Sequence, residues 1–285
     1  MRFLSGLILT LLIINNGYSF NHRLEISTIS FELEAGVFCP ATIIKGPLNT
    51  GQSSDILIWQ ENDNVTLRIV NFTSENHHIV FDNYADFGLI LPGDSSEITM
   101  NLSNTGVYRY YDILNSPYNN YHGTSGLMHV KATGDLANYF YWDLKEHKES
   151  WNNLIATGGA PVLANYYPDY FTINGNHAPN INSDPVARIV GNVNQEFKLV
   201  IMNNGLSIHS LHFHGYHLTV EKDSKNPSYT GRSKDSFGVY PNESLILSCT
   251  PDKPGEYPVH DHNLVAVTGG QQYATGMFST ILIAP

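Results

Sequence analysis

Short runs in which apolar and polar residues alternate follow one another along most of the chain. In residues 64–70 every second side chain is apolar, and residues 97–102 and 196–202 alternate in the same way. Alternation with a period of two places one set of side chains on a single face of an extended strand. Turn-forming residues such as Pro92-Gly93-Asp94 separate the runs. This pattern predicts an all-β fold made of short strands.

The two halves of the chain repeat one plan. Gly106-Val107-Tyr108 in the first half corresponds to Gly255-Glu256-Tyr257 in the second half. Pro92-Gly93-Asp94 precedes its strand as Pro241-Asn242-Glu243 precedes its own. We infer an internal duplication that produces two tandem Greek-key β-sandwich domains.

The boundaries of these domains follow from where the alternation stops. We expect the first domain over residues 20–133 and the second over residues 169–285. Residues 134–168 are aromatic and less regular, so we expect them to connect the domains and to contain one short helix around 144–155.

The first residues have the character of a secretory signal peptide. Arg2 is the only charge before an apolar run over residues 3–14, and a short polar stretch ends at Ser19. We predict a cleaved signal over residues 1–19 and a secreted or periplasmic protein, with an uncleaved anchor as the alternative. No later apolar stretch is long enough to span a membrane.

The composition excludes one class of partner and leaves open whether the two cysteines form a disulfide. The chain has 26 acidic and 15 basic residues and a formal net charge of −11, which excludes the basic footprint that nucleic acid requires. Cys39 and Cys249 are the only cysteines. In an oxidising compartment they could form a disulfide between the two halves; two buried free thiols are the alternative.

Histidine is the residue that suggests chemistry. Of the 13 histidines, His212 and His214 form one His-x-His pair and His260 and His262 form another. Residues i and i+2 share a face of a strand, so two such strands side by side would bring four imidazoles together. His217 has the opposite parity. Imidazole is the commonest side-chain ligand for copper, zinc, iron and nickel, so we expect a metal site here.

We expect the remaining histidines to have ordinary roles. The parity of its strand places His129 away from the predicted ligands. The histidines expected on the surface are His22, His147 and His177.

The histidine motifs resemble those of the multicopper oxidases. His209-x-x-His212-x-His214-Gly215 is similar to the penultimate copper motif of that superfamily, and His260-Asp261-His262, followed by Gly276-Met277, is similar to a modified last motif. The first half resembles the first cupredoxin domain of two-domain multicopper oxidases and copper nitrite reductases, through His77-His78, Asp112 and His122-Gly123. The resemblance implies that both sandwiches are cupredoxin-like (plastocyanin-like).

The resemblance also implies a role for each histidine. His209 would belong to a mononuclear copper site and His212 to a type 2 copper. The remaining three of the second half would bind a type 3 pair: His214, His260 and His262. In the first domain, His78 or its neighbour His77, together with His122, would be the mononuclear-site histidines.

The sequence departs from the family where a blue copper site needs sulfur. Asp112 and Asp261 stand at the two positions where the family has a cysteine, and a blue centre requires a thiolate ligand. A carboxylate with histidines could still bind Cu(II), Zn(II) or Fe(II) without strong colour. The candidate sets are His78, Asp112 and His122 in the first domain, and His209 and Asp261 with Met277 in the second. The first domain lacks His-x-His pairs, so a full trinuclear cluster cannot be assembled.

Three functions therefore compete at the level of sequence. The resemblance implies copper as the cofactor, ahead of zinc or iron, and favours a copper-dependent oxidoreductase of degenerate type that oxidises a small-molecule reductant. The missing thiolates favour a non-catalytic protein for copper binding, storage or tolerance. The third function is a scaffold for protein–protein contact, against which the two His-x-His pairs argue. Two-domain relatives build their cluster between subunits, so an oligomer is also open.

Overall fold

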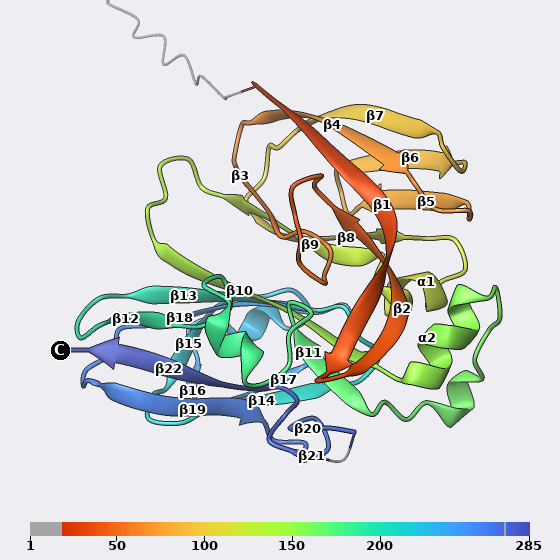
Figure 1. The fold of residues 1–285 in the computed structure, drawn as a ribbon. Helices are drawn as coiled ribbons and strands as arrows, with labels where there is room; N and C mark the ends of the chain where they lie inside the picture. The colour runs from red at the N-terminus through yellow and green to blue at the C-terminus, as the bar shows by residue number, and fades with distance from the viewer. Residues whose placement is uncertain (1–18, 271) are drawn as a thin grey trace, which may run out of the picture.

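The protein is an assembly of two β-sandwiches with a few short helices, as the computed structural model shows (Figure 1). The structure describes residues 19–270 and 272–285. The predicted signal peptide lies outside the described residues except for Ser19. The all-β prediction is confirmed. Among the described residues, no helix is long and apolar enough to cross a membrane.

The first sandwich consists of a four-stranded and a five-stranded sheet. The four-stranded sheet has the order β2 (Val37–Lys45), β1 (Ser19–Glu34), β4 (Asn64–Asn71) and β7 (Ser95–Asn101). The five-stranded sheet has the order β3 (Leu57–Gln60), β9 (Ser125–Lys131), β8 (Gly106–Asp112), β5 (His77–Phe81) and β6 (Ala85–Ile90). The alternation predicted in β4 is present, since Val65, Leu67 and Ile69 are fully buried between the sheets.

The second sandwich is built on the same principle. Its six-stranded sheet has the order β11 (Tyr170–Ile173), β10 (Asn138–His147), β13 (Phe197–Asn203), β18 (Ser244–Cys249), β15 (Leu218–Asp223) and β16 (Ser233–Lys234). Its five-stranded sheet has the order β12 (Val190–Asn192), β22 (Phe278–Ala284), β19 (Gly255–Asp261), β14 (His209–Phe213) and β17 (Ser236–Val239). The short strands β20 (Thr268–Gly269) and β21 (Gln272–Tyr273) pair with each other.

Residues 134–168, expected as a connection, instead contain a central strand of the second sandwich. β10 pairs with β13 and β11, and its side chains Phe140, Trp142 and Leu144 enter the core of that domain. The segment is aromatic because it lies inside a core. The helix expected around 144–155 is α2 (Glu149–Ala156). It begins later than expected because the residues up to His147 belong to β10.

The remaining helical turns are short. They are α1 (Tyr118–His122), η1 (Leu163–Asn165), η2 (Asn180–Ser183) and η3 (Pro227–Tyr229). In Figure 1, α1 and α2 lie side by side next to β2, and the long β1–β2 hairpin extends from the first sandwich to the second.

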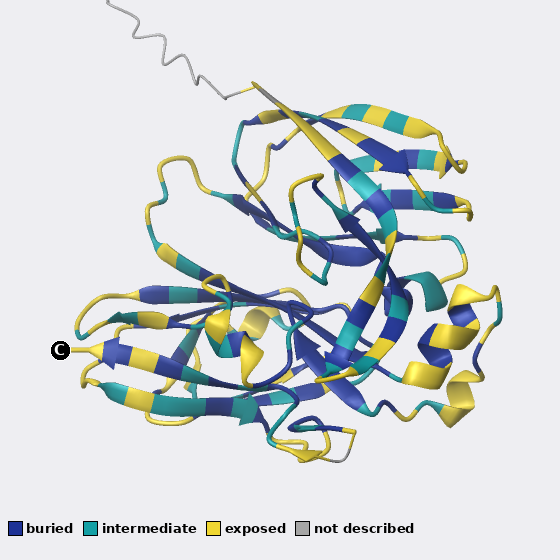
Figure 2. Cartoon of the chain, in the orientation of Figure 1, coloured by how far each residue is buried: buried dark blue, intermediate teal, exposed yellow. Residues whose placement is uncertain are grey.

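The two sandwiches share a packed interface. A buried apolar cluster joins Leu127 of β9 to Tyr141, Val200 and Met202 of the second domain. Figure 2 shows the burial pattern of the strands around this region, where dark blue marks buried residues. Beside the cluster, Arg109 Nε donates a hydrogen bond to Asn204 Oδ1 over 2.7 Å. The domains are therefore held by apolar contact as well as by the chain that links them.

The two cysteines do not form a disulfide. Cys39 lies on β2, in a small apolar cluster that includes Tyr170. Cys249 lies in the core of the second sandwich, and both thiols are free. Burial raises the pKa of Cys39 to about 12 and that of Cys249 to about 11. Both thiols are therefore protonated near neutral pH and are poor nucleophiles and poor metal ligands.

We predict that Leu127→Ala lowers the free energy of unfolding by about 2–5 kcal/mol, because it leaves a cavity where the two domains meet. Leu127 is fully buried and Leu136 is 94% exposed. Leu136→Ala is therefore the matched control, with an expected change within about 0.5 kcal/mol. Denaturant unfolding measures both. Equal, small effects would contradict the packed interface.

Candidate metal centre

Four histidines gather at one end of the second sandwich. In the register of β14 and β19, His212 lies opposite His260. The ring centroid of His212 lies 4.6 Å from that of His214 and 4.6 Å from that of His262. The centroids of His214 and His260 are 5.2 Å apart. The structure thus brings together the four imidazoles that the strand parity predicted, and exposed His217 lies outside this group.

One pair of ring nitrogens is already at the spacing of two ligands on one ion. The Nε2 atoms of His214 and His260 are 3.1 Å apart and share a hydrogen bond, whose proton a bound ion would displace. Nitrogens bound to a common ion at about 2.0–2.1 Å lie roughly 2.8–3.4 Å apart for angles between square-planar and tetrahedral. In the described residues no three His, Cys, Asp or Glu side chains converge as a complete ligand set, so the other rings would have to turn to join this pair.

Neighbouring groups fix which nitrogen each ring can offer. His260 Nδ1 donates a hydrogen bond to the carbonyl oxygen of Asp261 over 2.9 Å, and His212 Nδ1 lies 2.9 Å from the hydroxyl of Ser236. Metal-binding histidines commonly use one nitrogen for such a bond and the other for the metal. Both rings are therefore oriented to present Nε2 to the cluster.

Electrostatics keeps the cluster ready for a cation. Partial desolvation lowers the pKa of His214, and the neighbouring His212, His260 and His262 lower it further. Imidazoles this close repel one another when protonated, so the neutral form that binds metal is favoured. His214 and His262 are exposed, and the other two are half-buried. An ion could therefore reach the site from solvent.

Beneath this cluster lies a buried histidine–aspartate pair. His209 Nδ1 donates to Asp261 Oδ2 over 2.7 Å. Asp261 Oδ1 accepts hydrogen bonds from the backbone N–H groups of Ser210 and Asn263, at 3.1 and 2.8 Å. The carboxylate thus ties the start of β14 to the end of β19, which are the segments that carry the four histidines.

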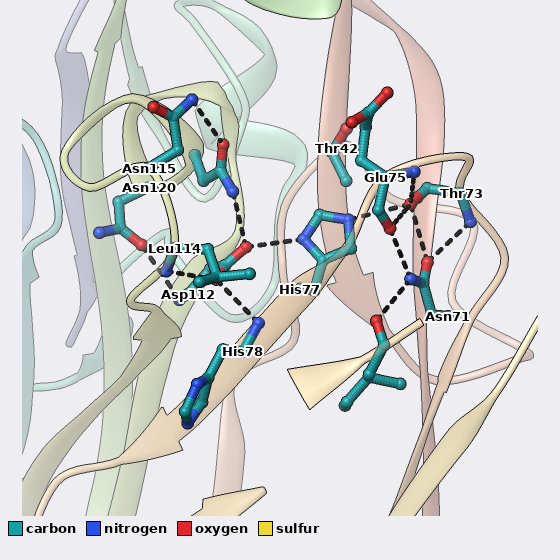
Figure 3. A network of polar contacts seen from close by, with 12 residues as sticks. Thr42, Asn71, Thr73, Glu75, His77, His78, Asp112, Leu114, Asn115 and Asn120 are labelled. Atoms are coloured by element: carbon teal, nitrogen blue, oxygen red, sulfur yellow. Dashed lines mark hydrogen bonds and ion pairs between the residues drawn. The ribbon is translucent and has the colours of Figure 1, made fainter. Parts of the chain in front are cut away.

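The first domain contains the same arrangement (Figure 3). His77 Nδ1 donates to Asp112 Oδ2 over 2.6 Å, and Asp112 Oδ1 accepts from the backbone N–H groups of His78 and Leu114, at 3.0 and 2.9 Å. The ring of His78 is turned away, and its Nε2 contacts Asp86. Of the two adjacent histidines, His77 is therefore the one that corresponds to His209.

The second ring nitrogen of each buried histidine faces a different partner. His77 Nε2 lies 2.9 Å from the hydroxyl of Thr73, whereas His209 Nε2 lies 3.6 Å from Glu146 Oε2. The carboxylate fits because position 205 is glycine: a Cβ on Gly205 would lie 1.6 Å from Glu146 Oε2.

These pairs leave no room for an ion between histidine and aspartate. A bridging metal would need each atom at about 2.0–2.2 Å, which holds the nitrogen and the oxygen roughly 2.8–3.5 Å apart. The observed 2.6 and 2.7 Å are shorter, and each Nδ1 is occupied by its hydrogen bond. The residues at the two mononuclear positions do not fit a metal as they stand.

Two further predicted ligands, His122 and Met277, are buried. His122 is buried and lies on α1, where burial lowers its pKa to about 4. Met277 is fully buried in the apolar core of the second domain. Of the candidate set in the first domain, His78 is turned away from Asp112. In the second domain His209 contacts Asp261 directly, and the backbone N–H of Asp261 donates to the carbonyl oxygen of Met277 over 3.2 Å.

Two of the three histidines expected on the surface are buried. His147 ends β10 and packs against Phe31, with ring centroids 4.7 Å apart, and burial lowers its pKa to about 3. His177 Nδ1 donates to the carbonyl oxygen of Ala178 over 2.8 Å. His22 is exposed. His129 is buried and hydrogen-bonded to the Tyr141 hydroxyl, away from the cluster.

Glu146 and Thr73 were missed at the level of sequence. Both act through contacts between segments that are far apart in the chain, which strand parity does not reveal. No local signal pointed to Glu146, because residues 143–149 are mostly charged and have the character of a solvated stretch.

Comparison with known proteins identifies the second domain. Residues 161–278 match the family model of the multicopper oxidases. This part of the chain is therefore similar to a multicopper oxidase domain. That domain contains all four clustered histidines, and the match implies copper as the metal. No curated protein matches the chain.

Solved structures extend the likeness to both sandwiches. A blue copper oxidase from Nitrosomonas europaea has a TM-score of 0.78 at 21% identity, covering 94% of this chain and 86% of that one. The multicopper oxidase mgLAC has a TM-score of 0.77 at 21% identity, covering 94% and 87%. A copper nitrite reductase from Nitrosomonas europaea has a TM-score of 0.72 at 16% identity, covering 93% and 94%. The cupredoxin fold expected for both domains is confirmed.

The two histidine–aspartate pairs predict different outcomes when each aspartate is replaced by asparagine. Asp261→Asn should weaken copper binding by about 10–100-fold, because the carboxylate positions the segments that carry the four histidines. Asp112→Asn breaks the twin pair in the other domain and should leave copper affinity unchanged while lowering stability to a similar extent. Copper titration and denaturant unfolding of both variants measure this. An equal loss of affinity in both would contradict the positioning role.

The buried imidazole of His209 predicts a pH dependence of stability. Burial opposes its charge, but the hydrogen bonds and negative charges of Asp261 and Glu146 raise the pKa of His209 to about 9. Because this exceeds the unfolded value of about 6.5, the pair stabilises the fold fully below pH 6.5 and loses that contribution as the pH rises through 9. The loss should amount to about 3 kcal/mol. Urea unfolding of metal-free protein at pH 6 and pH 9 measures this loss. In His209→Gln the free energy of unfolding should no longer fall between these two pH values. A fall as large as that of the wild type would refute the assignment.

Proposed function

We propose that this chain is an exported copper-binding protein with the fold of the multicopper oxidases, which holds copper at the four clustered histidines of its second domain and has no blue centre. The observation that carries this proposal is the 3.1 Å separation of the His214 and His260 Nε2 atoms within the cluster. Export is supported by the signal-like residues 1–19.

The chain's own groups prepare this site in three ways. Ser236 and the carbonyl of Asp261 orient two of the rings. The lowered pKa of His214 favours the neutral form of that ring, which has a lone pair for a cation. The buried carboxylate of Asp261 fixes the two strands relative to each other. Bound copper would supply one-electron redox chemistry at an exposed position.

A copper-dependent oxidoreductase of degenerate type is the second candidate, and the family match favours it. With both mononuclear positions closed by hydrogen bonds, electrons could not enter through an internal blue copper. A small-molecule reductant would have to reach the cluster itself, which the exposed rings of His214 and His262 allow. Oxygen consumption by the copper-loaded protein with ascorbate separates the two: turnover that depends on His212 and His260 supports the oxidoreductase, and its absence supports plain binding.

Copper titration of ligand variants tests the proposed site. His212→Ala and His260→Ala should each weaken binding by at least about 10–100-fold. The double variant should cost less than the sum, because each single change already breaks the shared site. Binding should also weaken below about pH 6.5, where free imidazoles take up protons.

His217→Ala is the matched control, because this exposed histidine lies in the loop between β14 and β15, outside the ring contacts of the cluster, and should have little effect. Small and equal effects for all variants would mean that the histidines bind copper loosely and separately. A large effect at His217 alone would contradict the assigned register.

A further inference from the structure

A cavity in the first domain takes no part in the proposed copper site. It encloses about 410 Å³, within the range of small-molecule sites. Its walls come from β1, β2, the loop between β4 and β5, α1 with the loop before it, and the end of α2. The lining residues are Thr28, Thr42, Thr73, Ser74, Glu75, Asn76, His77, Leu114, Asn115, Asn119, His122, Thr124, Ile155, Ala156 and Gly158.

Several polar groups around this cavity have unused hydrogen-bonding capacity. Thr124 is fully buried, and its Oγ1 has no hydrogen-bond partner. The hydroxyls of Thr28 and Thr42 meet only at 3.4 Å, and Asn115 Nδ2 reaches Asn119 Oδ1 only at 3.5 Å. Buried polar groups are nearly always paired, so such groups around a cavity point to a ligand that pairs with them.

One wall of the cavity is held rigidly. His77 is fixed between Asp112 and Thr73, and Asn119 Nδ2 donates to Asp112 Oδ2 over 2.8 Å (Figure 3). Figure 3 shows Asn115 and Thr42 to either side of the contact between Asp112 and His77. Such fixed side chains lower the entropy cost of binding. In the second domain the corresponding position beside His209 is taken by Glu146.

The charge of the lining residues restricts the ligand. No lysine or arginine is among the described residues that line the cavity, and Glu75 is their one carboxylate. The pKa of His122, lowered to about 4 by burial, leaves that ring neutral near pH 7. An anion would find no lysine or arginine here, whereas hydroxyl and amide groups suit a neutral ligand. Leu114 and Ile155 supply a small apolar surface.

We propose that this cavity binds a small neutral polyhydroxy molecule of the size of a monosaccharide. Its hydroxyls pair with Thr124, Thr42 and Asn115, and its carbon skeleton lies against Leu114 and Ile155. The site is separate from the histidine cluster, so it does not depend on the proposed copper function.

Saturation-transfer NMR on the metal-free, signal-cleaved protein tests this site. The neutral probes are D-glucose and myo-inositol, and the charged probe is D-gluconate. We expect transfer to at least one neutral probe and at least threefold weaker transfer to gluconate. Ala156→Trp fills the cavity from the exposed end of α2 and should abolish the signal. Thr124→Val removes one hydroxyl with little change of shape and should weaken binding at least threefold.

Ala160→Trp is the matched control, because Ala160 is exposed and does not line the cavity. This variant should bind as the wild type does. Absence of transfer to both neutral probes would overturn the proposal. Binding that survives in Ala156→Trp would also overturn it, as would gluconate binding more tightly than glucose.

Discussion

The arrangement of the candidate site depends on one buried contact, the hydrogen bond between an imidazole and a carboxylate. It occurs twice, as His209 with Asp261 and as His77 with Asp112, at 2.7 and 2.6 Å. In both places the carboxylate also accepts a hydrogen bond from one backbone N–H group on the neighbouring strand and from a second one two residues further along its own segment. The aspartate is therefore a cross-strand tie. It occupies the ring nitrogen that a metal would need, so the same contact that joins the two neighbouring strands closes the mononuclear position in each domain.

The duplication has led to different uses of one framework. In the second domain the paired positions of β14 and β19 are His212 and His260, whereas the first domain has Val80 opposite Tyr111. Among the described residues, the cluster of four imidazoles therefore lies at one end of the second domain. The first domain keeps the buried contact between His77 and Asp112 and has a polar cavity beside it. In the second domain the carboxylate of Glu146 lies at the corresponding position beside His209.

Much of the fold and part of the site followed from the sequence, because both rest on local periodicity. The period-two pattern located β4 and β13, and the same parity placed His212, His214, His260 and His262 together. The features that the sequence did not predict depend on contacts between segments that are far apart in the chain. The strand β10 was taken for a connection because its aromatic side chains showed no clear alternation. Parity alone could not choose between His77 and His78, and it gave no indication that Glu146 would reach His209 or that each aspartate would bind its histidine directly.

The copper K-edge X-ray absorption spectrum of the protein loaded with one equivalent of copper tests the central claim most directly. The account predicts imidazole nitrogen and oxygen as the only near ligands, no sulfur, and no intense absorption near 600 nm, with the signal altered by His260→Ala and unchanged by His77→Ala. Copper bound at the mononuclear positions would contradict it. That outcome would appear as a sulfur ligand, or as a spectrum that changes with His77→Ala and not with His260→Ala.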